Sequence, residues 1–108
     1  MKAVSTLRLV LVTAGCEKIA VDIAQALVKK KLAACVNINA SVRSIYRWKD
    51  SVIDDDEVLL IIKTSASNLK AVQKCIEEHH SYDVPEIISV PIDHGSEKYL
   101  KWWLDNLN

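Results

Sequence analysis

Glycine, proline and phenylalanine are scarce in this chain, which has two glycines, two prolines and no phenylalanine among 108 residues. With so few glycines, the sequence has no glycine-rich loop of the kind that cradles phosphate groups. It also has no apolar run close to the ~20 residues that a membrane-spanning helix requires. We therefore expect neither a phosphate-binding loop nor a membrane-spanning segment.

An excess of charge of one sign is also missing, because 14 basic and 14 acidic residues give a formal net charge of zero. A basic surface is the usual electrostatic signature of a nucleic-acid-binding protein. The balance therefore argues against a nucleic-acid partner and against attachment to an anionic membrane.

Cysteines are few and irregularly spaced, at Cys16, Cys35 and Cys75. An odd number without regular spacing does not indicate a disulfide framework. Free thiols are typical of a reducing compartment, which predicts a cytoplasmic protein. Cys35 and Cys75 have apolar neighbours and are expected in the core, whereas Cys16 precedes a helix, where a thiol can be more reactive.

The apolar pattern predicts one α+β domain over residues 1–108. An almost continuous apolar run predicts a central strand, and apolar residues at every fourth position then predict a helix. Strict alternation over Cys35–Trp48 predicts an unusually long strand that returns through a hairpin. The predicted elements are strand 7–13, helix 17–32, strand 35–48, hairpin tip 49–51, strand 52–63, a helix from Ser65 or Ser67 to His79-His80, strand 86–92, a turn at His94-Gly95, and a C-terminal helix capped by Ser96.

The order β-α-β-β-α-β matches the ferredoxin-like arrangement, an antiparallel sheet with both helices on one face, followed here by an extra helix. The strand over Cys35–Trp48 would span roughly 40 Å, whereas a domain of this size is about 35 Å across. The hairpin that carries Tyr46 and Trp48 must therefore bend sharply or protrude. An uncovered sheet face and a protruding ribbon would favour aggregation of a monomer, so we expect a closed homo-oligomer.

Five segments resemble the CutA family of divalent-cation tolerance proteins. They occur in the family's order and cover nearly the whole chain: LAACVN at 32–37, SIYRW at 44–48, LIIKT at 60–64, HSYDVPEI at 80–87 and YLKW at 99–102. The resemblance implies a ferredoxin-like fold and a cytoplasmic homotrimer whose long strands reach a neighbour's sheet. It also implies a role in metal tolerance, with copper as the usual bound ion. The family is structurally similar to trimeric PII-type signalling proteins, which bind small effectors between subunits.

The sequence departs from the family pattern at several positions. Ala40-Ser41 stand where the family often has Pro-Gly, and Asp50 stands where it often has glycine at the hairpin tip. Asp tolerates left-handed backbone geometry better than most residues, so the hairpin can form. Val12 occupies the position where some bacterial members carry a cysteine proposed to bind copper, so the family's metal site is not carried over intact.

The metal candidates are His79, His80 and Cys16, because imidazole and thiolate suit copper. Adjacent helical residues point about 100° apart, so one ion would bind both histidines only where the helix has ended. The alternative is structural: one histidine caps the helix C-terminus and the other packs against Tyr82.

A second candidate site rests mainly on the resemblance. Tyr46, Trp48, Lys63, Tyr82 and Glu86 are expected to line an inter-subunit cleft or the trimer interface. The alternative is an ion pair and a hydrogen bond that hold the trimer together. The acidic run 54–57 is expected to be solvated, with a cation-attracting rim as the alternative.

No catalytic group is recognisable, because the sequence has no evident nucleophile–base pair and no structural-zinc spacing. We therefore expect a non-enzymatic homotrimer that binds divalent metal ions, copper in particular. The alternative is a trimeric PII-like protein that binds a small molecule. RNA binding ranks last, because the predicted sheet lacks the paired aromatic residues of RNA-recognition modules.

Overall fold

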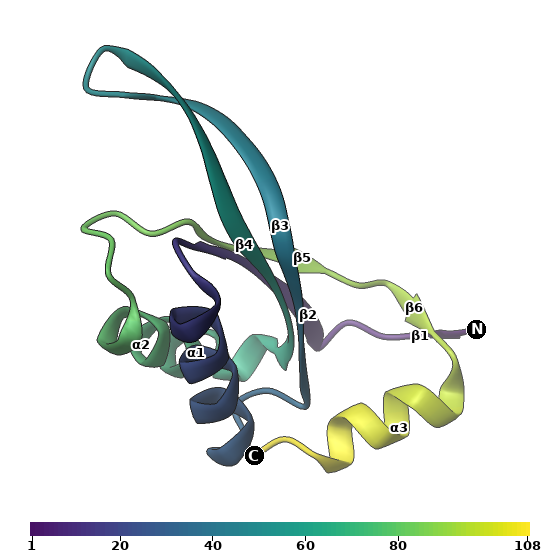
Figure 1. Ribbon diagram of the computed structural model, residues 1–108. Coiled ribbons are helices and arrows are strands. Elements are labelled where there is room, and N and C mark those ends of the chain that lie inside the picture. Colours follow the sequence, from purple (N-terminus) through teal and green to yellow (C-terminus); the bar gives the residue numbers. More distant parts are fainter.

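The computed structural model describes residues 1–108 and contains a four-stranded sheet, a two-stranded sheet and three α-helices (Figure 1). The large sheet has the order β3-β4-β2-β5, and all of its strand pairs are antiparallel. With α1 and α2 on one face, this is the predicted ferredoxin-like fold. The elements are β1 (Lys2–Ala3), β2 (Leu7–Ala14), α1 (Glu17–Lys29), β3 (Cys35–Trp48), β4 (Ser51–Ser65), the 3₁₀ turn η1 (Ala66–Asn68), α2 (Leu69–His79), β5 (Ile87–Pro91), β6 (His94–Gly95) and α3 (Glu97–Asp105).

The main core lies between the large sheet and helices α1 and α2. Alternate residues of a strand share one face, so β2 and β4 each direct every second apolar side chain toward the helices. Cys75 is buried in this core, as expected, whereas Cys35 is only half-buried. The largest buried side chains are Val10, Val12, Ile23, Leu27, Leu60, Ile62, Val72 and Ile76.

Helix α3 covers one end of the opposite face of the sheet (Figure 1). Leu100 and Trp103 from α3 pack with Leu7 and Ala34 in a second, smaller core cluster. The indole Nε1 of Trp103 donates a hydrogen bond to the carbonyl of Thr64 at 3.1 Å. This additional packing was not part of the sequence prediction, which left the whole face uncovered.

The rest of that face has no covering element. Ile88 and Val90 of the edge strand β5 are 52% and 42% exposed. They stand opposite Leu11 and Leu9 of β2 in the sheet register, so the four side chains form one continuous apolar strip.

Strands β3 and β4 continue beyond the sheet as a curved two-stranded ribbon (Figure 1). The pairing register shifts between Asn39 and Val42, so Ala40 and Ser41 form a β-bulge, which bends a strand. The ribbon thus both bends and protrudes, and the molecule measures 45 × 25 × 22 Å. At the tip, Lys49 and Asp50 have φ of 48° and 67°, the geometry of a two-residue type I′ turn.

Several local predictions were wrong. His94-Gly95 is not a turn but strand β6, because the N-terminal β1 pairs with it. Neither predicted serine caps α2, because the turn η1 intervenes and places Asn68 at the N-cap position. The first helix ends at Lys29 rather than residue 32, because the chain turns away through Lys31 at φ 57°. The Ser96 cap is confirmed, since its hydroxyl accepts a hydrogen bond from the Tyr99 amide.

Candidate functional site under the ribbon

A cavity of about 670 Å³ lies between the outer half of the ribbon and the loop 80–86 that joins α2 to β5. The bulge curls the ribbon over this loop, so segments far apart in sequence face each other (Figure 1). All of its walls come from one chain. The lining residues are Thr13 of β2, Ser44, Ile45, Tyr46 and Trp48 of β3, Glu57 of β4, and Tyr82, Asp83, Val84 and Glu86 of the loop.

Glu57 is the buried carboxylate of this cavity, with only 6% of its surface exposed. The Tyr82 hydroxyl donates a hydrogen bond to Glu57 Oε2 at 2.9 Å. The other oxygen, Oε1, has no hydrogen bond or ion pair with the protein and is not fully buried. A buried carboxylate is costly unless its charge is compensated, so this oxygen is available to a ligand in the cavity.

His80 holds the Tyr82 loop in place. Its Nδ1 accepts a hydrogen bond from the Tyr82 amide at 3.1 Å, and its Nε2 lies 2.7 Å from the carbonyl oxygen of Thr13. This pair of bonds requires the tautomer with the proton on Nε2, which donates to that carbonyl. The His80 and Tyr82 rings also pack at a centroid distance of 4.7 Å.

The pKa values of two tyrosines that line the cavity are raised, mainly by burial. Burial raises the pKa of the Tyr82 phenol above its ordinary value, and the hydrogen bond to Glu57 and the charges of Glu57 and Asp55 raise it further. Burial, together with the charges of Asp55 and Glu57, also raises the pKa of Tyr46. Both directions are expected where an added negative charge is disfavoured.

Positive side chains are absent from the wall of the cavity. Asp83 and Glu86 join Glu57 among the lining residues, and no Lys, Arg or His is one of them. Arg43 of the ribbon pairs with Asp54 instead, with Nε 2.8 Å from Oδ1. The acidic run therefore divides: Asp54 forms a surface ion pair, whereas Glu57, predicted to be solvated, is buried.

The three predicted metal donors do not form a closed site within the chain. No group of three His, Cys, Asp or Glu side chains is placed to hold an ion. Both ring nitrogens of His80 are engaged, and Nδ1 of His79 lies 2.8 Å from the Cys75 carbonyl, which leaves only Nε2 free. Cys16 is exposed at the N-cap of α1. These contacts are those of the structural alternative for the histidine pair.

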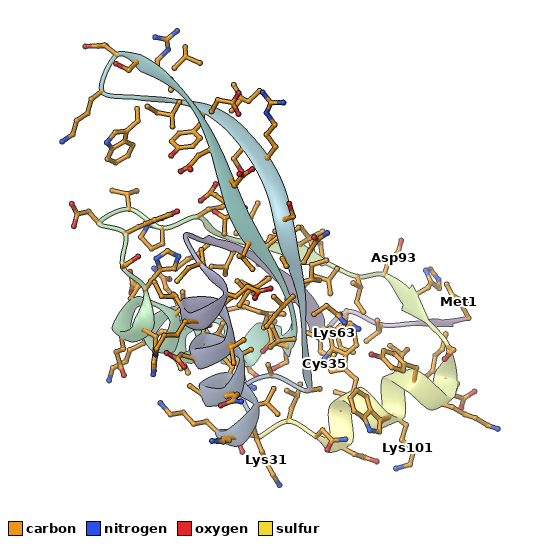
Figure 2. All side chains as sticks on the ribbon, viewed as in Figure 1. Met1, Lys31, Cys35, Lys63, Asp93 and Lys101 are labelled. Atoms are coloured by element: carbon orange, nitrogen blue, oxygen red, sulfur yellow. The ribbon has the colours of Figure 1, made fainter.

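Lys63 lies away from the cavity. It lies six positions after Glu57 in β4, which is about 20 Å along an extended strand. Its Nζ contacts the Tyr99 hydroxyl at 3.0 Å and the Cys35 sulfur at 3.9 Å, near α3 (Figure 2). The hydrogen bond with Tyr99 raises the pKa of Lys63.

The sequence prediction named four of the residues that line this cavity but not its buried carboxylate, Glu57. The sequence predicted that Tyr46, Trp48, Lys63, Tyr82 and Glu86 line an inter-subunit cleft or the trimer interface. The structure places four of them around this cavity, whereas Lys63 lies elsewhere. The burial of Glu57 was not predicted, because it belongs to the acidic run 54–57, which was expected to be solvated as a whole. It directly precedes the apolar run 58–62, and this position was the signal that could have placed it at the edge of the core.

The three helices are all too short or too polar to cross a membrane.

Comparison with known proteins gives consistent matches over most of the chain. The family model described as CutA1 divalent ion tolerance protein matches residues 8–106. The divalent-cation tolerance protein CutA of Thermus thermophilus is 43% identical over 97 residues, which are 90% of this chain and 94% of that protein. Human protein CutA is 44% identical over 91 residues, which are 84% of this chain but 51% of the human protein. The chain thus spans about half the length of its vertebrate relative.

Solved structures agree with the sequence matches. The divalent cation tolerance protein Cut A1 from Thermus thermophilus superimposes with a TM-score of 0.91 at 41% identity, covering 94% of this chain and 99% of that one. CutA from Synechococcus elongatus gives a TM-score of 0.93 at 33% identity, covering 99% of this chain and 95% of that one. On these matches in sequence and in fold, the chain belongs to the CutA1 divalent ion tolerance family.

Proposed function

We propose that this protein is a cytoplasmic homotrimer that binds divalent metal ions and contributes to metal tolerance without catalysing a reaction. The family membership supports the connection to divalent cations. The observation that carries the assembly is the apolar strip of Leu9, Leu11, Ile88 and Val90, in which Leu9 borders the α3 cluster and the other three lie beyond it. Three free cysteines, one of them exposed, support a reducing compartment.

The ribbon supports the same assembly. Ile45 and Val52 are both 65% exposed, and Tyr46 and Trp48 are only partly covered. Exposed apolar surface on this scale is typical of a protein–protein interface. A closed ring of copies covers both the strip and the ribbon and leaves no free strand edge.

Light scattering at low micromolar concentration tests the assembly. We expect a particle of about 36 kDa, three times the chain mass of 12.1 kDa. A stable particle of one chain mass would refute the assembly.

For the metal, we propose weak copper binding through Nε2 of His79, with the exposed thiol of Cys16 as a second donor. Few donors per chain imply weak binding, because tight copper sites use three or four ligands. Calorimetric titration with Cu(II), Cu(I) and Zn(II) tests this proposal. His79→Ala and Cys16→Ser should each weaken copper binding, whereas His94→Ala, which removes an exposed histidine on β6, should not. Unchanged affinity in the double variant of His79 and Cys16 would refute these donors.

The second candidate function is small-molecule binding, as in a PII-like signalling protein. The observation that favours it is the cavity under the ribbon, which holds a buried carboxylate with one unpaired oxygen. Its negative wall disfavours nucleotides and other phosphate-bearing effectors. Calorimetry with a nucleotide panel should therefore show no binding at this cavity, and binding that Glu57→Gln changes would contradict that expectation.

A further inference from the structure

We propose that the cavity under the ribbon binds an organic cation, of the ammonium or guanidinium class. This inference rests on the second candidate function, small-molecule binding, and specifies its ligand. Three kinds of side chain around the cavity attract positive charge: the buried carboxylate of Glu57, the aromatic rings, and the carboxylates at the rim.

The buried carboxylate provides the anchor. Glu57 is more than nine-tenths buried, and its Oε1 has no partner while Oε2 is held by Tyr82. An N–H of a bound guanidinium or primary ammonium ion would donate to this oxygen and compensate the charge, whereas a quaternary ammonium ion such as choline, which has no N–H, would compensate the charge alone. A charge-assisted hydrogen bond of this kind is stronger than a neutral one.

Aromatic rings provide the second element of recognition. Tyr46 and Trp48 line the cavity from the ribbon, and Tyr82 lines it from the loop. The negative face of an aromatic ring attracts ammonium and guanidinium groups, and several rings around one space recognise quaternary ammonium ions. Tyr82 is held rigidly by His80 and Glu57, so its position does not have to be fixed when the ligand binds.

The carboxylates at the rim of the cavity favour a positively charged ligand. Asp83 and Glu86 add two carboxylates, and no basic side chain lines the cavity. The nearest ammonium group to the Trp48 ring is that of Lys49 at the hairpin tip, 6.0 Å from the ring centroid. Burial is the largest cause of the raised pKa values of Tyr46 and Tyr82, and the charges of Asp55 and Glu57 raise both further. A bare metal ion would require converging donors, and no three such side chains converge anywhere in the chain. Organic cations interact favourably with aromatic rings as well as with carboxylates, so they suit this cavity better than a bare metal ion does.

Choline and its uncharged isostere 3,3-dimethylbutan-1-ol make a direct test, because they share shape and differ in charge. The readout is the indole N–H signal of Trp48 in ¹H–¹⁵N spectra, assigned by its loss in Trp48→Phe. We expect choline and methylguanidinium to shift this signal saturably and the neutral isostere to leave it unchanged. Glu57→Gln should weaken choline binding about tenfold, since it removes the buried charge, whereas Glu77→Gln on the exposed face of α2 should have no effect. Should Glu57→Gln fail to fold, Asp83→Asn on the loop tests the same charge dependence.

The cation could also be a side chain from a second copy of this protein, and the particle mass distinguishes the two sources. Dilution alone does not distinguish them, because Trp48 is also expected to contact a neighbour in the trimer. If a neighbour's cationic side chain fills the cavity, Glu57→Gln lowers the particle mass; if the cavity is free, the mass is unchanged. Equal binding of the neutral isostere would contradict a cationic ligand but would still support small-molecule binding. Binding of neither compound, with an unchanged mass for Glu57→Gln, would refute both. The trimer is tested separately by light scattering. Because one chain supplies all the lining residues of the cavity, a failure of the trimer would not by itself refute ligand binding.

Discussion

Truncation of Trp48 is the sharpest test of the proposed assembly. The indole lies at the end of β3, contributes to neither core cluster and is 45% exposed. Its exposed part amounts to about 100 Å² of a ring that can bury up to about 250 Å². A neighbour that covers this area gains about 2–3 kcal/mol per copy, at about 25 cal/mol per Å².

Three copies in a trimer multiply this effect. Trp48→Ala should cost about 7 kcal/mol for the whole assembly, which is about five powers of ten in the equilibrium constant between trimer and monomers. That constant depends on the square of the concentration, so the midpoint concentration of dissociation should rise about 300-fold. Sedimentation equilibrium over a dilution series measures this midpoint directly.

Trp102→Ala is the matched control, because Trp102 is 44% exposed but lies on α3, where it stacks on Tyr99. We expect a much smaller change in its midpoint. Circular dichroism should show that both variants keep their secondary structure. An unchanged midpoint for a folded Trp48→Ala variant would mean that no neighbour covers the ring, and the argument from the ribbon would be wrong.

Three further predictions concern the chain itself. Trp103→Ala should lower the free energy of unfolding in urea by about 3–5 kcal/mol, because it empties a core site and removes the hydrogen bond from the indole to the Thr64 carbonyl; a loss no larger than that of an exposed site would contradict the packing. The raised pKa of Tyr82 means that the unfolded state loses its phenolic proton first, so stability should fall above pH 10 by up to about 1.4 kcal/mol per pH unit. Tyr82→Phe should flatten this decline in pH-dependent urea titrations, and an identical slope would count against the buried phenol. Asp50→Gly should raise the unfolding free energy by up to about 1 kcal/mol, because glycine adopts the left-handed tip without strain; a loss of stability would contradict the turn assignment.

The elements with strong periodicity were predictable from sequence. The alternation over Cys35–Trp48 has no helical explanation, and its length alone required a ribbon that bends or protrudes. The strands β1 and β6 were not predictable, because two residues are too few to show a period and their pairing joins opposite ends of the chain. The turn η1 was not predictable for a similar reason, because a single turn leaves no periodic signal in the sequence. The expected serine cap of α2 was therefore wrong.

The candidate site was only partly predictable because its buried group contradicts local sequence statistics. A carboxylate in an acidic run is normally solvated, and only the bulge at Ala40-Ser41, a tertiary feature, turns the ribbon so that Glu57 is covered. Cys35 shows the converse error: its apolar neighbours suggested the core, but it lies opposite Lys63 in the register, on the other face of the sheet.

The ribbon connects the two proposals, because the same residues take part in both. Tyr46 and Trp48 line the cavity within their own chain and also present exposed surface to a neighbour. A ligand that fixes these rings removes conformational freedom that assembly must otherwise remove, and the reverse holds equally. Thermodynamic linkage requires this effect to be reciprocal: if a cation tightens the trimer by some factor, the trimer binds the cation more tightly by the same factor. The midpoint of dissociation should therefore fall when choline is present, and this shift should disappear in Glu57→Gln while the Trp48 ring is still in place.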